Sequence, residues 1–290
     1  MYPANFEYYR AGSVQEAVSL LQAHSGAKVL AGGHSLIPAM KIRLAEPPVL
    51  VDIGRIPGLS RVEAVGGSLR VGALTTHASL AASDVLHKNC PILSEAAAQI
   101  ADAQVRHKGT IGGNLAHADP GSDLPGVMLA LEGVFHVMGA GGERQIRAAD
   151  FFVDLLTTDL KPGEVLTAVE IPALGGRTGS CYLKFEHPAS GYAVVGAAAI
   201  VTLEDGGTCR EARLAFNGVT STPYRAAEVE AELIGKRLDE ATIAAAMEKL
   251  NIQDPMDDPV YASGAYRVHL ARVYGKNALL QAAERAGSTS

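Results

Sequence analysis

The first half of the chain alternates short helical patterns with short apolar runs. Ser13 and Glu16 form a capping box, and apolar side chains follow at helical spacing, which predicts a helix over residues 13–23. A short apolar run, a pair of glycines and a second helical stretch then follow in that order. The same reasoning predicts strands at 29–31, 49–53 and 69–74 and further helices at 35–43, 76–82 and 91–104.

From Phe135 onward the period of the apolar positions changes toward two residues, which favours strands. The glycine-containing linker at 172–179 marks a domain boundary, and helical patterning returns beyond Pro223. A second, α+β domain is therefore expected. The predicted strands are 134–138, 165–171, 181–186, 194–203 and 213–219. One face of a C-terminal helix is expected to hold Tyr266, Leu270, Val273 and Tyr274.

Composition places the chain among ordinary globular proteins. Its 290 residues, 48% of them hydrophobic and 19% charged, are enough for one large domain or two modest ones. A net charge of -6 and the lack of a Lys/Arg cluster argue against a nucleic-acid partner. Residues 1–10 contain no apolar signal segment, and the longest apolar stretch, 192–203, is too short to span a bilayer. We therefore expect a cytoplasmic protein without a membrane span.

The usual catalytic and metal-binding motifs are absent. The sequence has no GxGxxG, GxxxxGK[ST], HExxH or GxSxG, and Ser35 lacks the closing glycine of a nucleophile elbow. The polar, glycine-rich stretch at 109–123 predicts a loop; it contains His117, and His107 comes shortly before it. We expect these two histidines to form hydrogen bonds rather than to bind a metal. The scattered Cys90, Cys181 and Cys209 form no CxxC pair. They predict buried thiols rather than a disulfide framework or an iron–sulfur site.

Two double-glycine segments are the most informative local feature. Glycine lets backbone N–H groups approach a ligand closely, and hydroxyl or amide side chains flank both pairs. Either segment alone is typical of a turn, whereas two of them can enclose one pyrophosphate. Their residues are Ala31, Gly32, Gly33, His34 and Ser35, and Thr110, Ile111, Gly112, Gly113 and Asn114.

Three longer blocks resemble a known family. AGGHSLIPAMKIRLAEPPVLVDI at 31–53, TIGGNLAHADPGSDLPGVMLAL at 110–131 and YLKFEHPASGYAVVG at 182–196 are similar to blocks of the flavin subunits of molybdenum hydroxylases, in particular carbon monoxide dehydrogenase medium chains. The resemblance runs from about residue 2 to residue 285. His34 stands where many relatives have glutamine.

The resemblance implies an α+β protein with two domains. Residues 1–175 would form an FAD-binding fold of the vanillyl-alcohol oxidase and p-cresol methylhydroxylase type, with two α/β subdomains at about 1–56 and 57–175. Residues 178–290 would form a C-terminal domain with a three-stranded antiparallel sheet and helices.

The resemblance also implies roles for single residues. Both glycine segments would hold the FAD pyrophosphate through backbone donors, and Asp123 would contact the adenosine side. Lys184 would lie at the pyrimidine end of the isoalloxazine, where a cation stabilises an anionic reduced flavin. Tyr192 would lie against the ring and Leu160 at its edge. Without the resemblance, Lys184 reads as a solvated strand residue, Tyr192 as core and Asp123 as a helix cap.

Partners follow from what the chain lacks. Three scattered cysteines cannot hold an iron–sulfur cluster, so the resemblance implies a [2Fe-2S] small subunit and a molybdenum-cofactor large subunit on separate chains. The complex would be a dimer of heterotrimers that passes electrons to an external acceptor, namely a quinone, NAD or oxygen. Carbon monoxide, an N-heterocycle, an aldehyde or an acyl-CoA all remain open as the substrate. This chain would then need no catalytic acid or base.

Two alternatives belong to other classes. A self-sufficient flavin-dependent oxidase or dehydrogenase would bind its own substrate over the ring and would need a proton-accepting residue there. A non-catalytic nucleotide-binding scaffold subunit would purify without colour.

Overall fold

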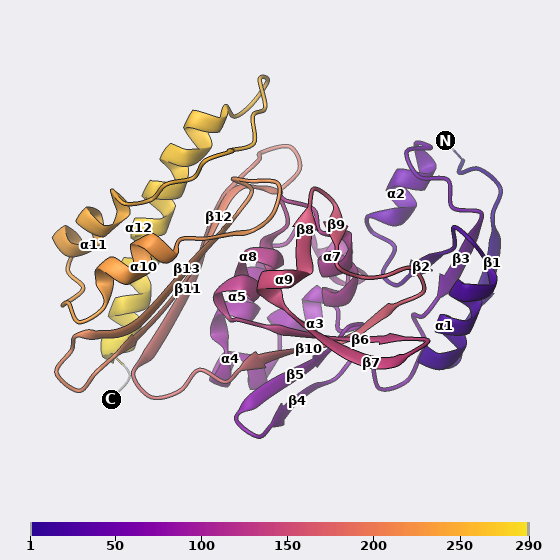
Figure 1. Cartoon of the computed structure of the whole chain (residues 1–290), viewed down its shortest axis with the longest axis horizontal. Coiled ribbons are helices and arrows are strands. Elements are labelled where there is room, and N and C mark those ends of the chain that lie inside the picture. The colour runs from indigo at the N-terminus through magenta and orange to yellow at the C-terminus, as the bar shows by residue number, and fades with distance from the viewer. Residues whose placement is uncertain (1, 289–290) are drawn as a thin grey trace.

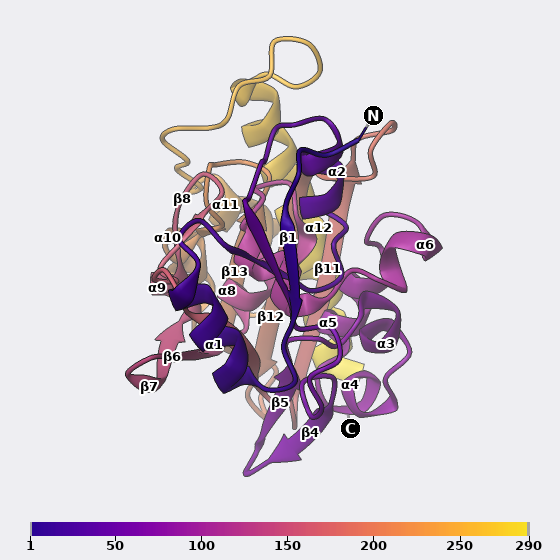
Figure 2. The same cartoon turned by 90° about the vertical axis from the view of Figure 1, so that its right-hand side faces the viewer.

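The N-terminal unit is a small parallel sheet with helices beside it (Figure 2). It belongs to a computed structural model that describes residues 2–288. Ser13 accepts a hydrogen bond from the Glu16 amide and so caps the first helix as predicted. The strand at residues 7–10 was not predicted, because its sequence EYYR has no apolar alternation. The strands are β1 (Glu7–Arg10), β2 (Lys28–Leu30) and β3 (Val49–Asp52), in the order β1-β3-β2, and the helices are α1 (Val14–Ala23) and α2 (Leu36–Lys41).

A five-stranded antiparallel sheet and a group of short helices form the middle of the molecule (Figure 1). The sheet has the order β4-β5-β10-β6-β7. Its strands are β4 (Val62–Val65), β5 (Ser68–Gly72), β6 (Val134–Gly139), β7 (Gly142–Arg147) and β10 (Val165–Pro172). The helices are α3 (His77–Ala81), α4 (Asp84–Asn89), α5 (Pro91–Ala98), α6 (Ala103–Arg106), α7 (Ile111–His117), α8 (Asp123–Ala130) and α9 (Ala148–Phe151). A separate two-stranded ribbon contains β8 (Phe152–Asp154) and β9 (Thr157–Thr158).

Two predictions for this middle part were wrong. The helix expected over 91–104 ends at Ala98, and α6 begins after Asp102, whose carboxylate accepts a hydrogen bond from the Val105 amide. The loop expected over 109–123 contains α7, which begins after Thr110. The Thr110 hydroxyl caps this helix by accepting a hydrogen bond from the Gly113 amide, so the second glycine pair lies in a helical turn.

The C-terminal sheet has the three long antiparallel strands that were expected, and a two-residue strand extends one edge. Strand β12 is buried along its whole length. Its residues 197, 199 and 201 pack into a cluster with α12, whereas 198 and 200 pack with the core of the middle unit. The sheet therefore joins α12 to the rest of the molecule. Its elements are β11 (Thr178–Glu186), β12 (Ala193–Leu203), β13 (Cys209–Asn217), β14 (Tyr224–Arg225), α10 (Ala227–Leu233), α11 (Glu240–Met247) and α12 (Gly264–Ser288).

The residues expected to share one face of α12 are not all buried. Leu270 is buried, but Tyr266 and Val273 are 41% and 38% exposed. Small residues make up much of the buried face, because the helix lies very close to β11. A Cβ added at Gly179 would lie 2.0 Å from the carbonyl oxygen of Ala282.

Two further findings concern the chain as a whole. Cys90, Cys181 and Cys209 are free and buried, as expected. Among the described residues, no helix is both long enough and apolar enough to cross a membrane.

The close approach of α12 to β11 leads to a stability prediction. Gly179→Ala should lower the free energy of unfolding by roughly 1–3 kcal/mol, because the new methyl group would force helix and strand apart. Gly206→Ala is the matched control, since a Cβ there has nothing within 4 Å. Urea unfolding of both variants tests this, and equal stability of the two would contradict the packing argument.

Candidate functional site

A cavity of about 480 Å³ lies where the N-terminal unit, the middle helices and a loop of the C-terminal unit meet. Both glycine segments reach it, together with residues from the connection into β10 and from the loop before β12. Of the residues expected from the sequence, Ile111 and Lys184 do not line it. Those that do are Ala31, Gly32, Gly33, His34, Ser35, Thr110, Gly112, Gly113, Asn114, Asp123, Leu160 and Tyr192.

The first glycine segment presents unused backbone donors to this cavity. It connects β2 to α2, and Gly33 has a φ of +73°, a left-handed conformation that glycine adopts without strain. Within the described chain, the amides of residues 32–35 donate no hydrogen bond to another protein group. A run of free N–H groups is an anion-binding arrangement.

The second glycine segment is different, which corrects the expectation that both present backbone donors. The Ile111 amide donates to the Thr75 carbonyl at 3.0 Å and the Gly112 amide to the Ala73 carbonyl at 2.8 Å. The amides of Gly113 and Asn114 donate to Thr110. Because α7 uses these groups for its own cap and for docking, side chains remain as its polar contribution to the cavity.

Close packing brings the two segments together. A Cβ at Gly32 would lie 2.0 Å from the Lys108 carbonyl oxygen, so only glycine allows this contact between the loops. His77 lines the same cavity and is 3% exposed, and its Nδ1 has no hydrogen-bond partner in the described structure. Burial lowers the pKa of His77 to about 4, and Arg106 and His34 add to the effect. The imidazole is therefore neutral at neutral pH.

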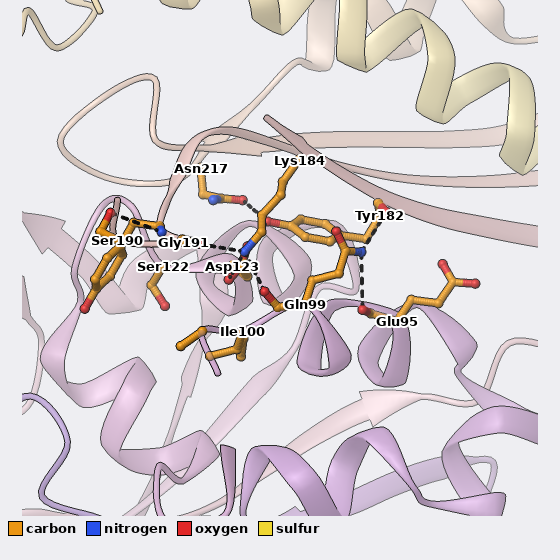
Figure 3. A network of polar contacts seen from close by, with 12 residues as sticks. Glu95, Gln99, Ile100, Ser122, Asp123, Tyr182, Lys184, Ser190, Gly191 and Asn217 are labelled. Carbon is orange, nitrogen blue, oxygen red and sulfur yellow. Dashed lines mark hydrogen bonds and ion pairs between the residues drawn. The ribbon is translucent and has the colours of Figure 1, made fainter. Parts of the chain in front are cut away.

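Lys184 and Asp123, one of the lining residues, form a buried ion pair (Figure 3). The Lys184 Nζ lies 3.2 Å from Oδ1 of Asp123, and the two side chains are 3% and 5% exposed. The same Nζ donates to the carbonyls of Gln99 at 2.7 Å and Gly191 at 2.9 Å. All three ammonium protons are thus directed at protein groups, which excludes the solvated-strand interpretation of Lys184.

Asp123 is the first residue of α8 and the one member of this pair that lines the cavity. Its Oδ1 accepts a hydrogen bond of 2.6 Å from the Tyr182 hydroxyl. Burial raises the pKa of Asp123 to about 6, although Lys184 and Tyr182 both act to lower it. The carboxylate is therefore costly to ionise and depends on its two partners.

Tyr192 and Leu160 both line the cavity. Tyr192 is 44% exposed, so it is not a core residue. A Cβ at Gly121 would lie 3.2 Å from its ring, so a glycine makes room for the tyrosine. Leu160 is partly buried against the middle core.

Several cavity residues were missed by sequence reasoning. Ile100 and Ala101 were assigned to the interior of a helix, but Ala101 has a φ of +42° and the Arg106 guanidinium donates to both carbonyls. The helix-start signal at Asp102 could have located this break. For His77, Glu164 and Val165 no local signal exists. In the part of the chain that is described, no group of three or more His, Cys, Asp or Glu side chains is placed to hold a metal ion.

Comparison with known proteins identifies the family. Residues 4–174 match the family described as FAD binding domain in molybdopterin dehydrogenase, and residues 180–282 match the CO dehydrogenase flavoprotein C-terminal domain. The chain therefore belongs to the FAD-binding medium subunits of molybdenum hydroxylases, and FAD is its cofactor. This confirms the resemblance and the fold seen in the sequence.

The relatives are oxidoreductase subunits that match along nearly their whole length. The carbon monoxide dehydrogenase medium chain of Hydrogenophaga pseudoflava is 39% identical over 96% of this chain and 97% of its own. The 6-hydroxypseudooxynicotine dehydrogenase complex subunit alpha of Paenarthrobacter nicotinovorans is 40% identical over 100% of this chain and 98% of its own. Among solved structures, carbon monoxide dehydrogenase from H. pseudoflava aligns with a TM-score of 0.94 at 39% identity, covering 98% of this chain and 99% of that one. Quinoline 2-oxidoreductase from Pseudomonas putida 86 aligns with a TM-score of 0.93 at 34% identity, covering 99% of both chains.

The ion pair leads to a prediction about pH. Lys184→Met should destabilise the protein by about 3 kcal/mol at pH 8, because it leaves the Asp123 carboxylate buried without its cation. The pKa of Asp123 is already raised to about 6 and would rise further. An acid whose pKa is raised by folding is stabilised in its neutral form, so the loss should shrink as the pH falls to 5.

Urea unfolding at both pH values measures this effect. Lys236→Met is the control, because that lysine is 51% exposed and forms a surface ion pair with Glu232. The double variant Lys184→Met, Asp123→Asn should recover much of the stability at pH 8. A loss that is the same at pH 5 and pH 8 would mean that the ion pair is not its cause.

Proposed function

We propose that this chain holds FAD in the cavity described above and serves as the electron-transfer subunit of a three-part molybdenum hydroxylase. The observation that carries the proposal is the run of unused amides at residues 32–35, which opens onto a cavity at the junction of the three units. An FAD pyrophosphate is a dianion, and such donors suit it without any lysine cluster.

The residues present fit the cofactor on several counts. The free amides of residues 32–35 form a cradle for a phosphate, and Gly32 and Gly33 in it have no side chain that would obstruct the phosphate. His77 and Asn114 both line the cavity and supply further polar side chains there. Tyr192 offers a flat, half-exposed ring where a planar group can stack. The cavity therefore has groups that suit the phosphates of FAD and a ring that suits its planar part.

In this proposal Lys184 acts through its partners and makes no direct contact with the flavin. Its Nζ fixes the Gln99 carbonyl, the Gly191 carbonyl and Asp123, and thus the position of Tyr192 beside Gly191. Its positive charge also offsets the carboxylate of Asp123, a residue that lines the cavity, and this carboxylate would otherwise repel an anionic cofactor.

We further propose that residues 1–175 form the FAD-binding domain, with subdomains near 1–56 and 57–175, and that 178–290 form the C-terminal domain. The ranges of the two family matches support this division. Bound FAD supplies a redox group that accepts electrons one at a time and releases two together. The protein's own contribution is to bind and orient this group, and no acid–base pair in this chain is assigned to substrate.

The partners in this proposal are a [2Fe-2S] small subunit and a molybdenum-cofactor large subunit, in a dimer of heterotrimers with an external electron acceptor. One related structure carries a name that refers to the molybdenum cofactor, and the relatives are described as medium chains or complex subunits. Those relatives act on chemically different compounds, including carbon monoxide and nicotine derivatives. Since closely similar flavin subunits serve such different substrates, the partner that binds the substrate sets the specificity.

The glycine cradle can be tested by a matched pair of variants. Gly33→Ala should raise the Kd for FAD about 10-fold, since a methyl group at a φ of +73° would lie 3.1 Å from Ile37 and 3.2 Å from Leu30 and would shift the turn that presents the free amides. Gly58→Ala carries the same kind of backbone strain at a φ of +85° but has nothing within 4 Å. Flavin absorbance titration of both variants gives the answer, and equal Kd values would rule the cradle out.

Partner dependence separates this proposal from a self-sufficient flavin enzyme. Under anaerobic conditions, candidate substrates should bleach the flavin absorbance only when the chain is assembled with its iron–sulfur and molybdenum subunits. The isolated FAD-loaded chain should stay oxidised, because it holds no substrate site of its own. Rapid bleaching of the isolated chain would instead establish the self-sufficient enzyme, and a colourless complex would establish the scaffold.

A further inference from the structure

One wall of the cavity is an irregular segment rather than a helix or strand. Residues 159–164 connect β9 to β10, and Leu160, Gly163 and Glu164 within it line the cavity. Few backbone hydrogen bonds hold this segment: the Asp159 amide donates to the Phe151 carbonyl, and the Glu164 amide to the Lys161 carbonyl. Its shape must therefore depend on side-chain contacts.

Those contacts converge on Arg144, a residue of strand β7. Its Nε and Nη2 donate to the two carboxylate oxygens of Glu164 at 2.7 and 2.8 Å. Its Nη1 donates to the Asp159 carboxylate at 2.8 Å, and Nη2 donates to the Asp159 carbonyl at 2.7 Å. One guanidinium thus joins the two ends of the segment in a geometry that no other side chain reproduces.

The segment closes on itself around this guanidinium. The Lys161 amide donates to the Glu164 carboxylate at 2.7 Å, and the Lys161 Nζ lies 2.6 Å from the Asp159 carboxylate. Hydrogen bonding from Arg144 lowers the pKa of Glu164, and Lys161 followed by Arg144 lowers the pKa of Asp159. Both acids are therefore ionised, and two cations balance them.

Glu164 is the critical member because it belongs to the cavity wall. Its side chain is 13% exposed, and its carboxylate is turned toward Arg144. Gly139 makes room for it, since a Cβ there would lie 3.0 Å from Cγ of Glu164. Without the guanidinium this carboxylate would be an unpaired negative charge beside the site of a dianionic cofactor.

We propose that Arg144, which does not itself line the cavity, is a positioning residue for cofactor binding. It sets the wall formed by Leu160, Gly163 and Glu164 and keeps the Glu164 carboxylate away from the cofactor. The inference rests on the proposed function, because it assumes that FAD occupies this cavity.

The chain offers a matched control on the same strand. Arg147 is also on β7, but its side chain is 77% exposed and its carboxylate partner is Asp150 rather than the cavity segment. Arg144→Gln and Arg147→Gln remove the same charge from the same strand. Arg144→Lys keeps the charge but loses the two-pronged geometry, so it separates the electrostatic contribution from the geometric one.

The experiment measures FAD binding by the three variants and the wild type, each purified with the subunits that it retains, stripped of flavin and titrated with FAD. We expect the Kd to rise ~10-fold for Arg144→Gln, by a smaller factor for Arg144→Lys, and less than ~2-fold for Arg147→Gln. The visible circular dichroism of the bound flavin should change in both Arg144 variants, since the wall beside the cofactor is altered. In the flavin-free state, the Tm of both Arg144 variants should match the Tm of Arg147→Gln.

Each result bears on one claim. If the wild type fails to bind FAD, the proposed function falls. If the wild type binds FAD but Arg144→Gln equals Arg147→Gln in Kd and in flavin circular dichroism, the role of Arg144 falls. If Arg144→Gln weakens binding only in step with a lower Tm of the flavin-free protein, the residue serves general stability and the inference is overturned.

Discussion

The ammonium group of Lys184 connects three segments that would otherwise be independent. It lies on β11, is 3% exposed, and binds the end of α5 at Gln99, the loop before β12 at Gly191 and the first turn of α8 at Asp123. A buried charge that loses its partner is strongly destabilising, so separating these segments would cost considerable free energy. Because Asp123 and Gly191 also line the cavity, the same interaction that joins the C-terminal sheet to the middle unit shapes the site.

Glycines determine the rest of the site, and they do so in two distinct ways. At Gly32 and Gly112 a side chain would collide with a neighbouring backbone, at Lys108 and at Ala73, so these glycines allow segments to touch. At Gly33 the left-handed conformation turns the chain so that successive amides remain unused. The two glycine pairs look equivalent in the sequence, yet one leaves open donors and the other docks a helix.

Much of the fold was readable from local patterns, and the failures have physical causes. The capped helix α1, the strands of the C-terminal sheet and the fully buried β12 follow from periodicity and caps. Helix α7 was missed because glycine pairs favour turns. The Thr110 cap and the close packing of Gly112 on Ala73 stabilise the helix there. Tyr266 and Val273 were expected to share a face of α12 with Leu270 but are exposed, because the close approach of the helix to β11 fills much of its buried face with small residues. Strand β1 carries no apolar alternation and is defined by its pairing with β3.

For this protein the sequence alone determined the family, the cofactor class and about a third of the residues that line the cavity, because those depend on ordered blocks and on residue types that local chemistry requires. The tertiary structure decided which amides are free, since an amide's availability depends on carbonyls far away in the chain, as at Gly112 and Ala73. It also decided that Lys184 is buried and fully bonded, and that Arg144 on β7 binds both ends of the segment that forms one wall of the cavity. These last properties arise from contacts between residues distant in sequence, and no local pattern of side chains specifies such contacts.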